Sequence, residues 1–352
     1  MRARAILRFL TVCVICFTVL IYNMVINIEL KSSESFVQAE ATSFISILKE
    51  QQSEQKEKIS EEKTKEQETD KTDKTETQSK ETVAASAEAI KGKILEKYIS
   101  PYNAPLSYNN VYMKNSTDLK IDIKSFLNGN ISFKIEKNKE PQVLIIHTHT
   151  TETFMTDNTD YYTENFVSRS RDNSKNMAKI GDIVSEKLNN AGIKTLHDST
   201  QHDYPNYSGS YSRSAQTINS YLKKYPSIKV VLDLHRDAVS ADNGGKTKLT
   251  TVIDGKKAAQ VMIVMGSQSG NVTNFPNWKE NLKLAVKLQQ VLEVKYPTLA
   301  RPLSLNSKNY NQSLTTGSLL IEFGTDVNTL EEACYSAELV GNALAQLLNG
   351  LG

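Results

Sequence analysis

The pattern of hydrophobic and polar positions divides the chain into three parts of different character. Residues 9–28 form an apolar run without a charged side chain, and its length of about 20 residues is what an α-helix needs to cross a bilayer. Between residues 50 and 81, Ile59 is the only aliphatic residue. After Pro141, apolar residues recur with the periods of strands and helices. We therefore expect the hydrophobic core in this last part.

Three arginines, Arg2, Arg4 and Arg8, precede the apolar run. Because positively charged flanks tend to stay in the cytoplasm, we expect the rest of the chain to lie outside it. A cleaved signal peptide is the alternative, but the run is long for one and no small-x-small cleavage site follows closely. We therefore predict an N-terminal membrane anchor at residues 1–30 and a single-pass protein of the cell membrane.

Residues 31–95 are predicted to form a polar, disordered linker. Its Lys, Glu, Gln, Thr, Ser and Asp side chains bury too little apolar surface to offset the entropy lost on ordering. The ~40 flexible residues at its centre would span on the order of 35–40 Å as a coil. A charged single helix over part of this segment is the alternative, and the pattern of residues 84–98 predicts a short helix.

Residues 96–140 are predicted to be an N-terminal extension that packs on the main domain. Apolar and polar residues alternate over residues 110–138, which indicates strands around a turn at Asn128-Gly129-Asn130. The main domain is predicted to span residues 141–352.

The pattern after Pro141 alternates between strands and helices. It predicts strands at residues 143–146, 193–197, 229–234 and 319–323, and helices at residues 174–191, 212–224, 281–294 and 330–348. Residues 250–253 and 261–265 flank Asp254-Gly255 and indicate a hairpin. This alternation predicts an α/β fold with a mostly parallel central sheet flanked by helices. Such sheets build their sites just beyond the carboxyl ends of the strands.

Three clusters of polar residues lie at those strand ends. They are His147, His149 and Glu152 after the first strand, Asp233, His235 and Arg236 at the end of another, and Glu322 at the end of the last. Two imidazoles and a carboxylate suit a catalytic Zn²⁺ site, which takes three protein ligands and leaves one position for water. The metal lowers the pKa of that water, and a nearby carboxylate can take its proton. This chemistry hydrolyses amides without a protein nucleophile.

We assign His149, Glu152 and His235 as candidate zinc ligands and Glu322 as the candidate general base. His147 is a further candidate ligand, but it points to the opposite face from His149 if the strand continues through both. One of the two would then bind the metal while the other supports it.

Several polar residues near these clusters have two interpretations. Asp172 is either a reserve ligand or the start of the following helix. Asp233 is a candidate supporting partner behind His235. Arg213 and Arg236 either hold substrate carboxylates or form ordinary salt bridges.

The remaining reactive residues indicate no other chemistry. His197 and His202 lie beside turn residues and are predicted to be surface positions. Cys334 lies in a helix that the pattern predicts to be buried, which argues against thiol chemistry. The chain has no Gly-x-Ser-x-Gly elbow, so a serine hydrolase fits poorly. A net charge of +2 does not indicate nucleic-acid binding.

Four motifs give the chain a specific resemblance. They resemble motifs of the stage II sporulation protein P family of endospore-forming Firmicutes and occur in the same order as in that family. The resemblance extends from about Asn110 to the C-terminus, and the motifs are VLIIHTHTTETF, SYSRSAQTI, VVLDLHRDA and LLIEFGTDVNTLEEA. This family is similar to the zinc N-acetylmuramoyl-L-alanine amidases. The resemblance implies hydrolysis of the amide between the lactyl group of muramic acid and L-Ala of the stem peptide, together with endopeptidase activity on cross-linked stems in peptidoglycan.

The resemblance also implies a biological setting and a set of site residues. It implies action with stage II sporulation proteins D and M in septal wall thinning and forespore engulfment, on the septal or mother-cell side. The two histidines of the first motif, Glu152, His235 and Glu322 match family positions connected with metal binding and catalysis. In the related amidases a carboxylate ligand lies further along the chain, where this sequence has Asp172.

Two other functions are compatible with these residues. One is a membrane-anchored module that binds peptidoglycan without cutting it and whose histidines are structural. The other is a zinc carboxypeptidase that trims stem peptides, which the spacing of His149 and Glu152 suggests.

Overall fold

The computed structural model describes residues 89–137, 140–242 and 244–352. These residues belong to one compact unit that begins at Ala85. The predicted anchor, and the predicted linker up to residue 88, lie outside the described residues. None of the helices within the described ranges is both long and apolar enough to span a bilayer.

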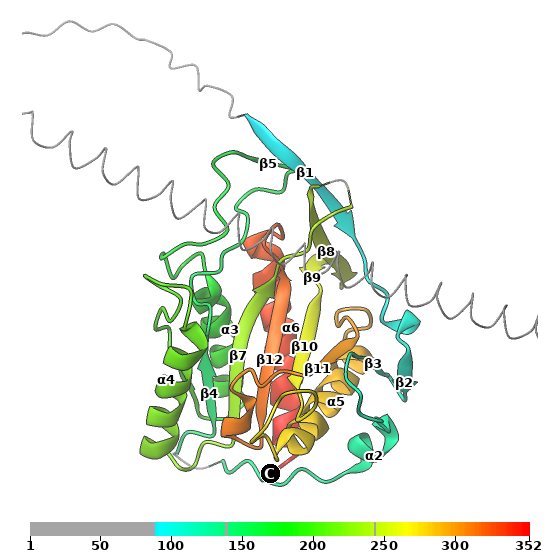
Figure 1. The fold of residues 1–352 in the computed structure, drawn as a ribbon, viewed down its shortest axis with the longest axis vertical. Helices are drawn as coiled ribbons and strands as arrows, with labels where there is room; N and C mark the ends of the chain where they lie inside the picture. The colour runs from blue at the N-terminus through cyan, green and yellow to red at the C-terminus, as the bar shows by residue number, and fades with distance from the viewer. Residues whose placement is uncertain (1–88, 138–139, 243) are drawn as a thin grey trace, which may run out of the picture. The chain divides into compact units, whose positions relative to one another are not determined.

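A mixed sheet forms the centre of the described unit (Figure 1). In spatial order its strands are β2 (Leu106–Tyr108), β3 (Val111–Asn115), β11 (Leu303–Asn306), β10 (Val261–Gly266), β12 (Ser318–Thr325), β7 (Val230–Asp237), β4 (Val143–Ile146) and β6 (Thr195–His197). The strands from β12 through β7 and β4 to β6 run parallel, and β3, β11 and β10 also run parallel to one another.

The predicted α/β class is confirmed, but the sheet is mixed rather than mostly parallel. The strand β10 runs antiparallel to β12, and β2 runs antiparallel to β3. The chain enters β10 directly from β9 (Lys256–Ala259), without a helical crossover. The chain therefore enters the central sheet at β10 from the end opposite to that at which β12 begins, and an alternation of apolar segments does not reveal this reversal.

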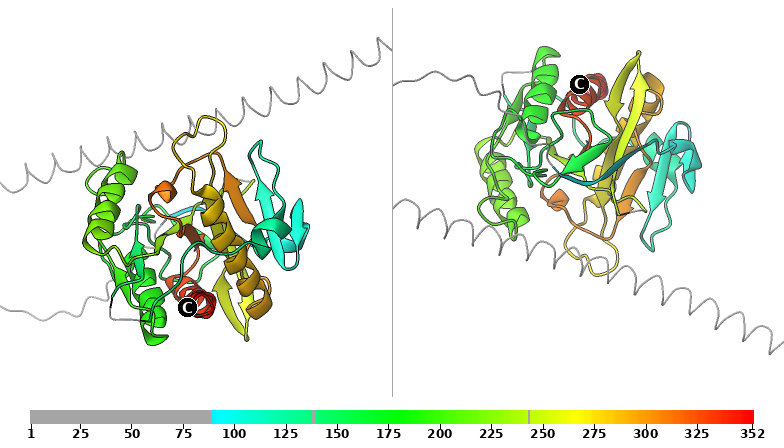
Figure 2. Two further views of the ribbon diagram at one scale, coloured as in Figure 1. Left: turned by 90° about the horizontal axis from the view of Figure 1, so that it is seen from below. Right: turned by 90° about the horizontal axis from the view of Figure 1, so that it is seen from above.

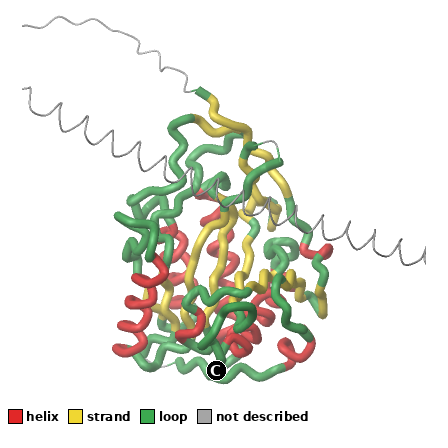
Figure 3. The backbone as a smooth tube through the Cα atoms, in the orientation of Figure 1, coloured by secondary structure: helices red, strands yellow, loops and turns green. Residues whose placement is uncertain are grey.

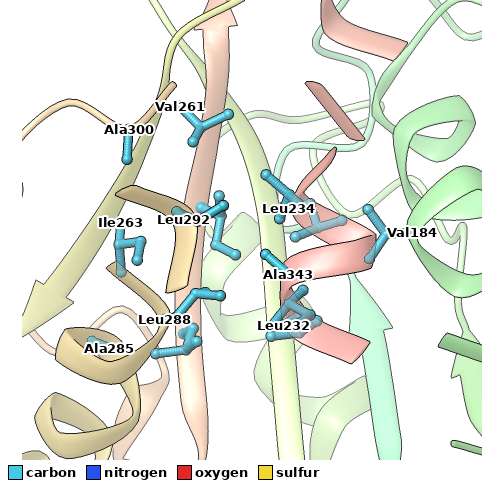
Figure 4. Close-up of a cluster of buried hydrophobic side chains, with 14 of the residues drawn as sticks. Val184, Leu232, Leu234, Val261, Ile263, Ala285, Leu288, Leu292, Ala300 and Ala343 are labelled. Carbon is cyan, nitrogen blue, oxygen red and sulfur yellow. The ribbon is translucent and has the colours of Figure 1, made fainter. Parts of the chain in front are cut away.

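Helices cover both faces of the sheet (Figures 2 and 3). On one face α3 (Met177–Asn190), α5 (Trp278–Lys295) and α6 (Leu330–Asn349) share a large apolar core with the strands. Figure 4 shows part of this core, in which Leu232 and Leu234 of β7 lie near Val184 and Ala343. On the other face α4 (Ser210–Lys224) packs on β4.

The unbroken apolar run of β4 follows from the burial of both of its faces. Val143 and Ile145 belong to the core of α3, α5 and α6, whereas Leu144 and Ile146 belong to the core of α4. A parallel strand that is buried on both faces needs apolar residues at every position.

A smaller sheet contains β5 (Tyr161–Thr163), β1 (Ile90–Lys97), β8 (Lys246–Ile253) and β9, in that order. The short helix predicted at residues 84–98 is wrong, because β1 pairs with β5 on one side and with β8 on the other. Tertiary hydrogen bonds here override local helix propensity. The strand begins within the range predicted as linker.

The Asp-Gly pair marks a hairpin, although not between the strands expected. Asp254 and Gly255 have φ values of 49° and 78° and connect β8 to β9, as a two-residue type I′ turn requires. The predicted second strand of this hairpin is instead β10, which belongs to the central sheet.

The strands predicted around Gly129 are also wrong. The helix α2 (Ile123–Asn128) precedes that residue, and the Asp122 side chain accepts a hydrogen bond from Lys124 N at its start. Ile123 and Leu127 are buried at helical spacing. Within the described part of the predicted range β3 is a strand, and it pairs with β2 and with β11 of the central sheet. Two short 3-10 helices, η1 (Pro101–Asn103) and η2 (Gln312–Leu314), complete the described elements.

Candidate metal centre

The candidate residues on β7 and β12 face away from α3, α5 and α6. In β7, Leu232 and Leu234 enter the core under those helices, so the alternate residue His235 points to the face that α4 covers. Glu322 alternates in the same way in β12 and is the direct partner of His235 in the strand register. The strand order places these side chains next to the end of β4, as the sequence predicts.

His149, Glu152 and His235 form a buried group that can hold a metal ion. One ligand atom from each lies within 4.8 Å of the other two. Glu152 Oε1 is 3.4 Å from His149 Nδ1, and Glu152 Oε2 is 3.6 Å from His235 Nδ1. The structure therefore brings together three of the four residues that the sequence suggests as ligands.

The other ring nitrogens of these two histidines each lie near a polar group, although His235 Nε2 forms no hydrogen bond with the residues that the structure describes. His149 Nε2 lies 3.1 Å from Ser210 Oγ, and His235 Nε2 lies 2.9 Å from Asp233 Oδ1. Asp233 also accepts hydrogen bonds from the backbone N and the hydroxyl of Thr148, at 2.8 and 2.6 Å. Partners of this kind orient metal-binding histidines. They leave both Nδ1 atoms directed at Glu152, and Asp233 occupies its predicted place behind His235.

Threonine hydroxyls hold the segment that carries His149 and Glu152. Thr150 Oγ1 donates to Thr200 O at 2.6 Å, and Thr151 Oγ1 donates to Asp203 Oδ2 at 2.6 Å. Buried loops need such partners because they lack the regular hydrogen bonds of helices and strands. The repeated threonines of the first motif thus fix the ligand positions.

The charges within the group shift the pKa values of His235 and Glu152 in opposite directions. Burial alone would lower the pKa of His235, but the charges of Asp233 and Glu152 raise it well above its usual range. Burial alone would raise the pKa of Glu152, yet hydrogen bonds from His149 and His235 and the charge of Arg236 hold it well below its usual range. Two imidazole nitrogens and a carboxylate, each with a supporting partner, are a donor set that fits Zn²⁺.

Glu322 differs from Glu152 in its surroundings. Its Oε2 is buried and forms no hydrogen bond with the residues that the structure describes. Burial raises the pKa of Glu322 to about 8, helped by the charges of Asp237 and Glu152 and opposed by those of His235 and Arg301. A carboxyl group with such a pKa can exchange a proton near neutral pH.

His147 lies outside this group, on the side of the sheet where α3 packs. Its Nδ1 donates to Leu234 O at 3.0 Å, and its Nε2 is 2.9 Å from His197 Nε2. A Cβ atom at Gly181 of α3 would lie 2.6 Å from His147 Nε2, so the glycine makes room for the two rings. Burial, with the charge of His197, lowers the pKa of His147 to about 3. The structure therefore places His149, and not His147, beside Glu152.

Comparison with known proteins places the chain in a family. Residues 19–345 match the family described as stage II sporulation protein P (SpoIIP). The chain belongs to this family. The resemblance seen in its four motifs is thereby confirmed. Stage II sporulation protein P of Bacillus subtilis (strain 168) is 30% identical over 216 residues, which are 58% of this chain and 50% of that protein. The chain thus spans about half the length of the curated relative that it matches.

Solved structures of N-acetylmuramoyl-L-alanine amidases also align with this member of the family. Ami1 from Mycobacterium abscessus has 12% identity and a TM-score of 0.35, over 59% of this chain and 99% of that one. AmiC2 of Nostoc punctiforme has 12% identity and a TM-score of 0.36, over 60% and 96%. An amidase from Clostridium difficile 630 has 15% identity and a TM-score of 0.34, over 60% and 97%.

Both arginines proposed for substrate binding hold loops of the site. Arg213 Nε donates to His202 O at 2.6 Å, and its other nitrogens donate to the carbonyls of Asn206 and Ser208. Arg236 donates to Thr153 O at 3.1 Å and to Ser168 O at 2.6 Å. The guanidinium groups of both arginines thus donate hydrogen bonds to backbone carbonyls rather than to carboxylates.

Asp172 is not part of the buried group. It is exposed and accepts hydrogen bonds from the backbone N and the hydroxyl of Ser174, at 3.0 and 2.7 Å. Asn176 caps α3 instead, because its side chain accepts from Ala178 N. Of the two candidate carboxylates, Glu152 is therefore the one that lies beside the histidines.

The prediction that His197 and His202 are surface residues is wrong. His202 is 2% exposed, and its ring nitrogens lie 2.8 Å from His147 O and 2.9 Å from Thr217 Oγ1. His197 Nδ1 lies 2.9 Å from Asp182 Oδ1, and its side chain is 10% exposed. The turn-rich segment before α4 folds onto the site, which a composition of turn residues does not indicate.

Sequence reasoning missed the aromatic residues around the histidines. His149 stacks on Tyr207 with ring centroids 4.6 Å apart and meets Tyr211 edge to face at 5.6 Å. Tyr211 also lies nearly parallel to His235, and its ring is 6.3 Å from that of Tyr310. The one available signal was the tyrosine-rich segment directly before and within the SYSRSAQTI helix.

Proposed function

We propose that this chain is a zinc-dependent peptidoglycan hydrolase that cleaves the amide between the lactyl group of muramic acid and L-Ala of the stem peptide. The buried group of His149, Glu152 and His235, with Glu322 paired beside His235 in the strand register, carries the proposal. Membership of the stage II sporulation protein P family supports a role in sporulation.

The chain offers ligands and a base in separate positions. His149, His235 and Glu152 would hold the ion, with Asp233 and Ser210 orienting the two rings. A bound zinc ion supplies Lewis acidity and lowers the pKa of water. Glu322, when ionised, accepts the proton of the attacking water and returns it to the leaving amine.

Product analysis tests this proposal. The chain is incubated with purified peptidoglycan, with and without a chelator, alongside the His235→Ala variant, and the products are identified by mass spectrometry. We expect stem peptides with a free L-Ala amine, lost with chelator or variant and restored by zinc. Release of single terminal residues would instead identify a carboxypeptidase, and cleaved cross-links would reveal endopeptidase activity. Wall binding without any product, unaffected by chelator, would contradict the proposal and favour a binding module.

The setting of this activity is a further part of the proposal. Residues 9–28 would anchor the chain in the cell membrane with the hydrolase outside, on the septal or mother-cell side. There it would act with stage II sporulation proteins D and M in septal thinning and engulfment, as family membership suggests. Protease added to intact protoplasts should digest the C-terminal part of a membrane-associated chain. Full protection would contradict this orientation.

A further inference from the structure

The ring of Tyr211 lies against both histidines of the candidate metal centre. It meets His149 edge to face at a centroid distance of 5.6 Å and lies 6.5 Å from His235 at an interplanar angle of 15°. Tyr211 is near the start of α4, on the face of the sheet that also carries Glu322. The ring of Tyr211 therefore lies beside both proposed histidine ligands, on the face of the sheet that carries the proposed base.

The position of Tyr211 is held from the backbone side as well. Asn311 Nδ2 donates to Tyr211 O at 2.8 Å and lies 3.0 Å from Ser214 Oγ. Asn311 and Tyr310 have positive φ values of 57° and 51°, a left-handed conformation that is unfavourable for a bulky residue such as tyrosine. Such conformations persist where the surroundings enforce them, and they cluster at functional sites.

The hydroxyl of Tyr211 is left without a partner in this tightly bonded region. It forms no hydrogen bond with any residue that the structure describes, whereas the hydroxyl of the preceding residue, Ser210, lies 3.1 Å from His149 Nε2. A tyrosine hydroxyl has an ordinary pKa of about 10, so it carries its proton at neutral pH and can donate a hydrogen bond.

We propose that Tyr211 is a catalytic residue whose hydroxyl donates a hydrogen bond to the carbonyl oxygen of the scissile amide. This inference rests on the proposed amidase function. As the oxygen of water bonds to the carbonyl carbon, the C=O π electron pair moves to the carbonyl oxygen, which then carries negative charge. When the C–N bond breaks, that pair returns to re-form C=O, and the amine leaves with the proton that Glu322 delivers. Tyr211 keeps its own proton throughout.

A preorganised donor of this kind stabilises the transition state more than the substrate. Removal of one such donor in other acyl-transfer enzymes lowers kcat by about 10² to 10³. Tyr211→Phe deletes only the hydroxyl and keeps the ring that packs on His149 and His235. Tyr207→Phe is the matched control, because Tyr207 also stacks on His149 and likewise carries a hydroxyl.

The experiment compares the kinetics of the full chain and both variants on muropeptides, with zinc affinity measured alongside. We expect kcat of Tyr211→Phe to fall by about 10² with KM changed less than about threefold. Tyr207→Phe should stay within about threefold of the parent, and both variants should keep the parent's zinc affinity. An unchanged kcat in Tyr211→Phe, an effect on KM alone, or an equal loss of kcat in Tyr207→Phe would overturn the inference.

A binding measurement separates this role from a structural one. A phosphonamidate analogue of the scissile amide imitates the tetrahedral transition state, and such analogues bind more tightly than substrates. Tyr211→Phe should lose about 10² in affinity for the analogue and little for the uncleaved substrate peptide. Equal losses for both would overturn the inference. If the parent chain itself releases no product, the proposed function fails and this inference with it. An active parent with an unaffected Tyr211→Phe refutes the inference alone.

Discussion

Two pairs of histidines lie on opposite faces of the same sheet. On the face that α4 covers, the Nδ1 atoms of His149 and His235 both approach the carboxylate of Glu152. On the face that α3 covers, His147 and His197 contact each other directly, with their Nε2 atoms 2.9 Å apart. The first arrangement leaves a place for an ion between the rings, whereas the second uses its nitrogens for internal hydrogen bonds.

The same difference appears in the electrostatics of the two pairs. Nearby carboxylates raise the pKa of His235 well above its usual range, despite its burial. Burial, with the charge of His197, lowers the pKa of His147 to about 3. Histidine at a strand end is therefore not enough to make a ligand. A buried carboxylate that faces the ring is what distinguishes the candidate metal centre.

The largest expected difference in zinc affinity is between variants that each remove one histidine from one of the two pairs. In His149→Ala one proposed ligand is lost, so we expect zinc affinity to fall by more than about 100-fold, beyond the effect of losing a supporting partner, and hydrolysis to fall to background. In His147→Ala zinc affinity should change by less than about tenfold. That variant should instead lose about 1–3 kcal/mol of folding free energy, because the His197 nitrogen is left unpaired. Zinc titration and urea unfolding check both. Equal loss of zinc affinity in the two variants would contradict the distinction.

The contrast between Glu152 and Glu322 gives the next largest effect. Glu322→Gln removes the proposed base and should lower kcat by about 10² to 10⁴, while zinc affinity stays within a few-fold of the parent. Activity and zinc titration of the same preparation check this. Full activity would rule out the assigned role.

The raised pKa of Glu322 predicts how the unfolding free energy of the metal-free protein depends on pH. Its folded pKa is about 8, above the value of about 4.3 for an unfolded chain. Between these values the folded chain binds more protons than the unfolded one, so this residue lowers the unfolding free energy as pH rises. Urea unfolding should therefore show that, between pH 5 and pH 8, the parent loses unfolding free energy relative to Glu322→Gln. A difference that is the same at both pH values would contradict the raised pKa.

The smallest expected change in zinc affinity comes from removing a side chain that orients the imidazole ring of a proposed ligand. Ser210→Ala removes the hydroxyl beside His149 Nε2, and we expect about a tenfold loss of zinc affinity because the ring is less well oriented. Thr217→Val is the matched control, since it removes the hydroxyl beside Nε2 of His202, which is outside the group. It should leave zinc affinity unchanged. If Thr217→Val weakens zinc binding as much as Ser210→Ala does, the orienting role of Ser210 is refuted.

The strongest sequence predictions concern strands that are buried on both faces and helices with a regular apolar face. β4 is a short unbroken apolar run, β7 and β12 each contain three consecutive apolar residues, and α3 and α6 show helical spacing that ends near a glycine. The convergence of His149, His235 and Glu322 followed from the direction of parallel strands alone. The predictions that failed concern segments whose structure depends on distant partners. β1 is held by β5 and β8, and the loop with His202 folds onto the strand ends.

By itself, the sequence determined which residues can carry the chemistry and which strands present them, because hydrophobic periodicity sets the elements and the elements set the side-chain directions. It did not determine which of His147 and His149 lies beside Glu152, nor that Tyr211 packs against His149 and His235. Those outcomes depend on which face of the sheet each side chain enters and on which helix covers that face. Only tertiary packing decides this, because the contacts join residues far apart in the chain whose spacing carries no local signal.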